Sequence, residues 1–109
     1  YGFIYPGRIK MKKILLVCSA GMSTSLLVSK MEKVAAERGL ECKIEAHGNN
    51  DVSKFANDFD VCLLGPQVKY ALEQVKNDLP NMNVDVIDRM VYAMGDGEKA
   101  LDQALELIK

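Results

Sequence analysis

Short apolar runs alternate with segments of helical periodicity along the chain. Residues 12–17 and 60–64 are almost wholly apolar, a pattern typical of strands that are covered on both faces. Residues 42–46 alternate polar and apolar positions, as an edge-like strand does, and residues 84–88 form a further short apolar segment. The pattern therefore predicts four strands.

Helical spacing fills the intervals between these runs. Residues 24–38 place apolar side chains on one face and are followed by a glycine, which predicts an amphipathic helix. A second helix is predicted after the Gly-Pro pair at 65–66, a closing helix over residues 99–108, and a short helix over residues 52–57. The apolar positions of the first helix are Leu27, Met31, Val34 and Ala35.

Strands that alternate with helices predict a parallel α/β sheet, because right-handed crossovers place helices on both faces. We expect a four-stranded sheet of order 2-1-3-4, with the first strand central. Ligands of such sheets bind beyond the carboxyl ends of the strands. Here those ends lead into segments that begin at Cys18, His47, Gly65 and Asp88.

The length of 109 residues fits one domain. We expect residues 11–109 to form it, with Met11 as the native start, and we interpret residues 1–10 as a leader or a cloning remnant. Fourteen basic and fifteen acidic residues give a net charge of -1, which argues against a nucleic-acid-binding protein. No apolar run approaches the roughly 20 residues that cross a bilayer.

Three widely spaced cysteines, Cys18, Cys42 and Cys62, are an odd number and indicate a reducing compartment. We therefore expect a cytoplasmic protein. Cys42 and Cys62 fall within predicted strands and are interpreted as small core residues. His47 is the only histidine and is interpreted as an ordinary residue at the end of a strand.

The segment between the first strand and the first helix is built of small and hydroxylated residues. Successive N–H groups in such a loop can surround a tetrahedral anion, and the helix N-terminus adds partial positive charge. The same dipoles should lower the pKa of the Cys18 thiol and make its thiolate a nucleophile. The predicted phosphate-binding loop consists of Ser19, Ala20, Gly21, Met22, Ser23, Thr24 and Ser25.

Other interpretations of this loop remain open. Cys18 can simply end a strand as a small apolar residue, with the hydroxyls capping the helix, in a domain that only binds a partner. Low-molecular-weight tyrosine phosphatases share the strand, cysteine and phosphate loop, but they place an arginine where this chain has Thr24. The absence of that arginine favours a phosphoryl carrier over a phosphatase-like or oxyanion-reductase enzyme.

Three separated segments agree in order and spacing with one known family. Residues 14–25, residues 64–70, and residues 86–97 with their Tyr92 resemble the IIB component of the lactose/cellobiose (diacetylchitobiose) family of the bacterial phosphoenolpyruvate-dependent sugar phosphotransferase system. The resemblance spans residues 11–109. It implies a fold like that of low-molecular-weight tyrosine phosphatases.

The resemblance also implies a reaction and its partners. A phosphohistidine of the IIA protein would phosphorylate Cys18, and the phosphocysteine would then phosphorylate a sugar bound by the membrane IIC permease. That activity is a protein-phosphohistidine–sugar phosphotransferase, acting at the inner face of the membrane. We expect a monomer, because a carrier must bind two partners in turn with the same loop, and the displacements need no cofactor or metal. Cellobiose, lactose, chitobiose or another β-linked oligosaccharide all remain open as the sugar.

A second loop is expected beside the first. Gly65, Pro66 and Gln67 follow the third strand, and the Gln67 amide is placed to bind phosphate or a partner; alternatively, this segment is only a helix entry with proline at its start. Tyr70, one turn further on, is interpreted as a packing residue. Met22 is either part of an apolar docking surface or a core residue.

Overall fold

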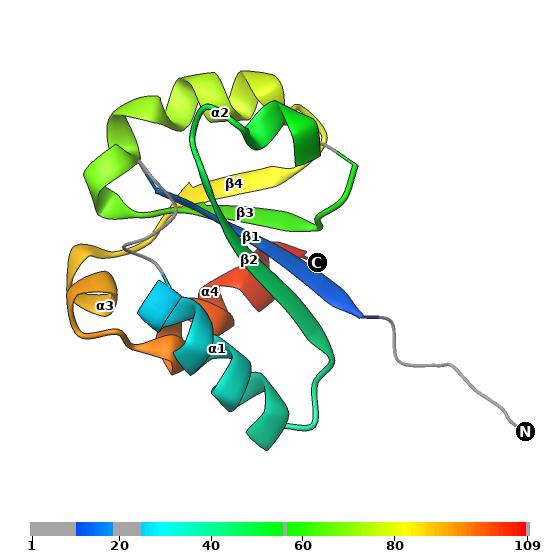
Figure 1. Cartoon of the computed structure of the whole chain (residues 1–109), viewed down its shortest axis with the longest axis vertical. Coiled ribbons are helices and arrows are strands. Elements are labelled where there is room, and N and C mark those ends of the chain that lie inside the picture. The colour runs from blue at the N-terminus through cyan, green and yellow to red at the C-terminus, as the bar shows by residue number, and fades with distance from the viewer. Residues whose placement is uncertain (1–10, 19–24, 56, 109) are drawn as a thin grey trace, which may run out of the picture.

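Four parallel strands form one sheet in the computed structural model, which describes residues 11–18, 25–55 and 57–108. The sheet order is β2-β1-β3-β4, so the first strand is central, as predicted (Figure 1). The strands are β1 (Lys12–Cys18), β2 (Cys42–Gly48), β3 (Val61–Leu64) and β4 (Asn83–Val86). The predicted strand order and the parallel α/β class are confirmed.

Helices cover both faces of this sheet, also as predicted. Figure 1 shows α1 (Ser25–Glu37) and α4 (Gly97–Ile108) on one face, and α2 (Leu72–Asp78) on the other. Two 3-10 helices, η2 (Val52–Phe55) and η3 (Pro66–Ala71), accompany α2. Within the described ranges, no helix is both long and apolar enough to cross a membrane.

The alternation of side chains along β1 divides the core into two layers. Ile14 and Leu16 pack in the layer that contains α1 and α4, whereas Leu15 and Val17 pack in the layer that contains α2. All four side chains are fully buried. Burial of one such side chain stabilises a fold by about 1.5–3 kcal/mol, so β1 is firmly anchored beneath the candidate site.

The fourth strand is shorter than predicted, and an unpredicted helix follows it. Strand β4 ends at Val86, and α3 (Arg89–Ala93) occupies residues that the sequence pattern left without structure. Asp88 begins this helix, because its Oδ2 accepts hydrogen bonds from the N–H groups of Met90 (3.0 Å) and Val91 (3.4 Å). The predicted extension of the strand to residue 88 is therefore wrong.

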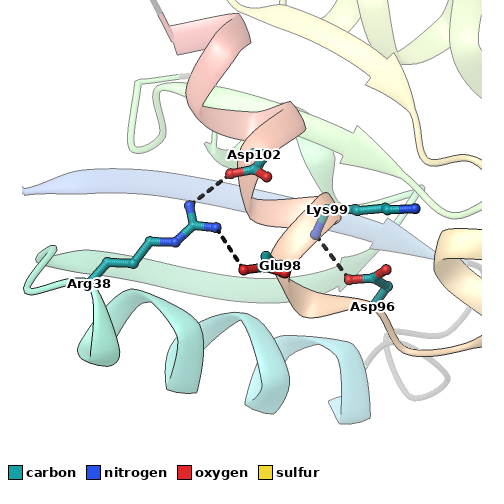
Figure 2. A network of polar contacts seen from close by, with 5 residues as sticks. All are labelled: Arg38, Asp96, Glu98, Lys99 and Asp102. Carbon is teal, nitrogen blue, oxygen red and sulfur yellow. Dashed lines mark hydrogen bonds and ion pairs between the residues drawn. The ribbon is translucent and has the colours of Figure 1, made fainter.

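Polar contacts join the end of α1 to the first turns of α4 (Figure 2). The Arg38 guanidinium donates to Oδ1 of Asp102 over 2.7 Å and lies 3.6 Å from Oε2 of Glu98. Asp96 caps α4 by accepting a hydrogen bond from the Lys99 N–H group (3.1 Å). These contacts align the two helices that cover one face of the sheet.

Candidate functional site

Cys18 is the last residue of the central strand and lies at the carboxyl edge of the sheet. Its neighbour in the register is Gly48 on β2, and the preceding Val17 is paired with Leu64 on β3. The Cys18 side chain is completely buried. Strand β1 thus delivers the cysteine to the place where a doubly wound sheet binds its ligands.

Backbone hydrogen bonds hold this end of β1 from both sides. The Gly65 N–H group donates to the Val17 carbonyl oxygen over 2.8 Å, and the Asn49 N–H group donates to the Cys18 carbonyl oxygen over 3.1 Å. The peptide units that flank the cysteine are therefore fixed by the segments that follow β2 and β3. This arrangement suits a nucleophile that must be held in one orientation.

Most of the predicted phosphate-binding loop lies outside the described residues. Ser19, Ala20, Gly21, Met22, Ser23 and Thr24 belong to that segment. Ser25 is described and is the exposed first residue of α1. Helix α1 thus begins directly after the loop, and its thirteen residues supply the partial positive charge of a helix N-terminus.

The segment after β3 lies beside Cys18, as predicted. Gly65 is buried against β1, and Gln67 folds back over it, so that a Cβ built on Gly65 would lie 2.6 Å from Gln67 Oε1. The Gln67 Nε2 atom donates to the Tyr92 hydroxyl over 3.0 Å. Pro66 opens η3. Tyr70 is 75% exposed, so its interpretation as a packing residue is wrong.

A cavity of about 280 Å³ lies between the start of α1 and the end of α3. Its lining is mainly apolar and includes Leu26, Leu27, Tyr92 and Met94. Leu26 and Met94 also expose 63% and 72% of their surface. Large apolar side chains that remain exposed beside a site are typical of surfaces that proteins use for binding.

The two remaining cysteines, Cys42 and Cys62, lie within strands β2 and β3. Burial raises the pKa of the Cys62 thiol to about 12. The pKa of the Cys42 thiol is also raised by burial, against the opposing effect of the Lys12 charge. Both thiols are therefore protonated at neutral pH, which agrees with their interpretation as core residues.

His47 packs as an ordinary histidine at the end of a strand, as interpreted from the sequence. Its ring stacks on Phe55 with the centroids 4.1 Å apart, and its Nε2 atom lies 3.0 Å from Oε1 of Glu45. In the part of the chain that the structure describes, no group of three or more His, Cys, Asp or Glu side chains is arranged to hold a metal ion.

Comparison with known proteins decides the family. Residues 13–103 match the family described as "PTS system, Lactose/Cellobiose specific IIB subunit", where PTS denotes the phosphotransferase system. The chain belongs to this family. It is 46% identical to the oligo-beta-mannoside-specific EIIB component of Bacillus subtilis over 100 residues, which cover 90% of this chain and 97% of that protein. The family resemblance stated from the sequence is confirmed.

Two further IIB proteins extend the comparison. The cellobiose-specific EIIB component of Lactococcus lactis is 41% identical over 104 residues, which cover 89% of this chain and 96% of that protein. The solution structure of the cellobiose-specific IIB component of Borrelia burgdorferi superimposes with a TM-score of 0.78 at 34% identity, covering 91% of this chain and 93% of that one. The IIB family thus shares this four-stranded architecture.

Some IIB relatives are joined to another component. The lactose-specific EIICB component of Lactococcus lactis is 25% identical over 96 residues, which cover 84% of this chain but only 17% of that protein. By its name, that protein carries the IIC and IIB components in one chain. IIB function is therefore coupled to a IIC component in such relatives.

Sequence reasoning located the cysteine and the second loop but missed the contact between the second loop and α3. Gln67 and Tyr92 are 25 positions apart and meet through a side-chain hydrogen bond that no periodicity indicates. The cavity beside α3 was also missed, because the helix that forms one wall has only five residues. The presence of Tyr92 in the third segment that resembles the family was the available signal.

Proposed function

We propose that this IIB protein carries a phosphoryl group on Cys18, accepts it from a phosphohistidine of a IIA protein, and donates it to a sugar held by a IIC permease. The position of Cys18 carries this proposal. The residue ends the central strand, and backbone N–H groups from two neighbouring segments bind its own carbonyl oxygen and that of Val17. A small-residue loop and the N-terminus of α1 follow it.

The first transfer is an in-line displacement at phosphorus. The Cys18 sulfur, as thiolate, forms the new S–P bond while the P–N bond to the donor imidazole breaks, and the electron pair of that bond returns to the ring nitrogen. The N–H groups and hydroxyls of residues 19–25 would hold the three non-bridging oxygens as charge develops on them. The N-terminus of α1, which follows the loop, favours the thiolate form of Cys18 over the thiol.

The second transfer reverses the role of the cysteine. A hydroxyl oxygen of the sugar forms an O–P bond, the S–P bond breaks, and the electron pair returns to sulfur, while the hydroxyl proton passes to a base or to solvent. Neither transfer requires oxidation, reduction or a bound metal. The protein ends the cycle with the thiolate restored and acts as a phosphotransferase with a phosphocysteine intermediate.

A phosphatase-like or oxyanion-reductase enzyme is the alternative, and two features argue against the phosphatase. Thr24 stands where that family has its phosphate-binding arginine. Asp88, the carboxylate that follows the fourth strand, is engaged as the N-cap of α3 and accepts two backbone N–H groups. A carboxylate used in this way is poorly suited to protonate a leaving group.

The partners and location follow from the same proposal. We infer a single carrier domain over residues 11–109 that works as a monomer in the cytoplasm and meets the membrane through IIC. Two relatives are named for oligo-beta-mannoside and cellobiose, which supports a β-linked disaccharide or oligosaccharide as the acceptor, and a third, 42% identical, is named for galactose.

The test is intact-protein mass spectrometry after incubation with phosphoenolpyruvate, the general phosphotransferase proteins and a IIA protein shown to be phosphorylated. Wild type and Cys42→Ser, the matched cysteine control, should gain one phosphoryl group, whereas Cys18→Ser should gain none. The group should disappear when IIC membranes and sugar are added. Modification that persists in Cys18→Ser would place the acceptor elsewhere, and rapid hydrolysis of an aryl phosphate would support the phosphatase.

A further inference from the structure

The chain before the loop is fixed through Gly65. Its N–H group donates to the carbonyl oxygen of Val17, the residue that precedes Cys18, over 2.8 Å. Gly65 itself is held from the other side, because its carbonyl oxygen accepts from the Val68 N–H group over 3.0 Å. Any displacement of Gly65 therefore moves the end of β1.

Gln67 rests on that same glycine. A Cβ on Gly65 would lie 2.6 Å from Oε1, 3.0 Å from Cδ and 3.1 Å from Nε2 of Gln67. The side-chain amide of Gln67 therefore occupies the space that a side chain at position 65 would need. The amide is thereby turned toward α3. Its Nε2 atom donates to the hydroxyl oxygen of Tyr92 over 3.0 Å.

Tyr92 continues the connection to the far end of the loop. It stands on α3, whose start is fixed by the Asp88 cap, and it lines the cavity of about 280 Å³ together with Leu26 and Leu27. Leu26 and Leu27 belong to the first turn of α1, directly after residues 19–24. Tyr92 thus borders the chain where the loop ends.

We propose that Gln67 and Tyr92 are positioning residues for Cys18, because their hydrogen bond connects the two ends of the segment that carries the reaction. The inference rests on the proposed function of Cys18. At one end of the connection, the Gly65 N–H group donates to the Val17 carbonyl oxygen. At the other end, Tyr92 lines the same cavity as Leu26. We name Gln67, Tyr92 and their hydrogen bond the Gln–Tyr bracket.

The physical reason lies in how an anion cradle works. Backbone N–H groups stabilise a thiolate or a phosphoryl group only while they converge on it, and small displacements of such groups reduce transfer rates steeply. The Gln–Tyr bracket joins η3 to α3, and so it connects the segment that follows Gly65 with the helix that lines one cavity together with the first turn of α1. Its loss should loosen the loop without unfolding the sheet.

The experiment compares Gln67→Leu, Tyr92→Phe and the double variant with wild type. Tyr92→Phe removes a single oxygen and keeps the ring in the cavity, so it remains informative if Gln67→Leu folds poorly. Gln103→Leu is the matched control, because Gln103 also joins two elements by donating to Asp85 Oδ2 and the Val86 carbonyl oxygen, each over 3.1 Å, but it does so between α4 and β4.

Two quantities are measured. The first is the rate at which phosphorylated IIA labels Cys18, which should fall about two- to tenfold in each single variant, the range expected for one hydrogen bond. The second is the pH profile of Cys18 alkylation by iodoacetamide with no partner present, which should shift to higher pH. The double variant should resemble the more affected single variant, because both substitutions remove the same bond.

Three results would overturn the inference. If both single variants keep the wild-type labelling rate and the wild-type pH profile of alkylation, the Gln–Tyr bracket does not position Cys18. Slower labelling with an unchanged alkylation profile would mean that the pair contacts the donor protein. Effects of the same size in Gln103→Leu would indicate general loosening. If wild type itself is not phosphorylated, the proposed function fails, whereas the alkylation profile still tests the bracket.

Discussion

Gly97 lies directly against the backbone of Lys30. A Cβ built on Gly97 would stand 2.6 Å from the carbonyl carbon of Lys30 and 2.7 Å from its oxygen. Helix α4 therefore begins in contact with the main chain in the middle of α1, and no side chain fits between them. The preceding Gly95, with a φ of 60°, gives the turn that brings α4 to this point.

Gly97→Ala should lower the free energy of unfolding by about 1–3 kcal/mol, because the added methyl group must push two packed helices apart. The measurement is urea denaturation followed by circular dichroism. Lys99→Ala, on the exposed face of the same helix, is the control and should change stability by less than about 0.5 kcal/mol. Equal stability of Gly97→Ala and wild type would show that the helices separate without cost.

Asp88→Ala should destabilise α3, since the first N–H groups of that helix lose their acceptor. A lost N-cap costs about 0.5–2 kcal/mol, and here the loss should appear first as faster hydrogen exchange at the amides of Met90 and Val91, which donate to the Asp88 carboxylate. Asp88→Asn, which keeps a side-chain acceptor, should exchange nearly as wild type does. Unchanged protection in Asp88→Ala would mean that packing alone holds the helix.

Cys62 should make stability fall in alkaline solution. Its pKa in the folded protein is about 12, whereas a thiol in an unfolded chain titrates near about 8.5. Above that lower value the unfolded state has lost a proton that the folded state keeps, so unfolding becomes more favourable as pH rises. The contribution is complete below about pH 8.5 and declines by up to about 1.4 kcal/mol per pH unit above it.

The comparison that isolates this effect uses Cys62→Ala. Denaturation measured between about pH 8 and pH 10.5 should show a steeper loss of stability in wild type than in the variant. Cys42→Ala should alter the slope less, because Cys42 is only partly buried. Parallel curves for wild type and Cys62→Ala would show that the thiol of Cys62 titrates normally.

The raised pKa values also predict which cysteine reacts. Iodoacetamide at neutral pH should label Cys18 before Cys42 and Cys62, because the N-terminus of α1 favours the Cys18 thiolate, whereas burial raises the pKa of the other two thiols. Peptide mapping by mass spectrometry would identify the labelled site. Labelling of Cys62 ahead of Cys18 would contradict both the assigned burial of β3 and the role proposed for Cys18.

The fold was predictable where apolar patterns are long or clear. Strand β1 and the two longest helices, α1 and α4, follow directly from periodicity. Helix α3 was not predicted because its five residues include no buried side chain, so no apolar face marks it. Asp88 as a capping residue was the local signal. The segment after Gly65 is predicted as one helix, but it begins as the 3-10 helix η3, whose backbone departs from helical angles at Val68, and it continues as α2 from Leu72.

The candidate site was predictable as far as strand order determines it. Once β1 is central, the segments after Cys18 and Leu64 must lie side by side at one edge of the sheet. The direction of individual side chains did not follow from that rule. The contact between Gln67 and Tyr92 depends on how two short helices leave the sheet, and the exposure of Tyr70 depends on the rotation of η3.

Strand β1 leaves the ribosome before β2 and β3, the strands with which it pairs. Because all the strands are parallel, long connections separate β1 from these neighbours. Its pairing with β2 requires the whole of α1, and its pairing with β3 must wait for a still longer stretch of chain. Distant pairings of this kind form slowly. The strand that bears Cys18 is thus synthesised before the segments that enclose it, and the Gly65 N–H group that holds its end becomes available only after β3 has been made.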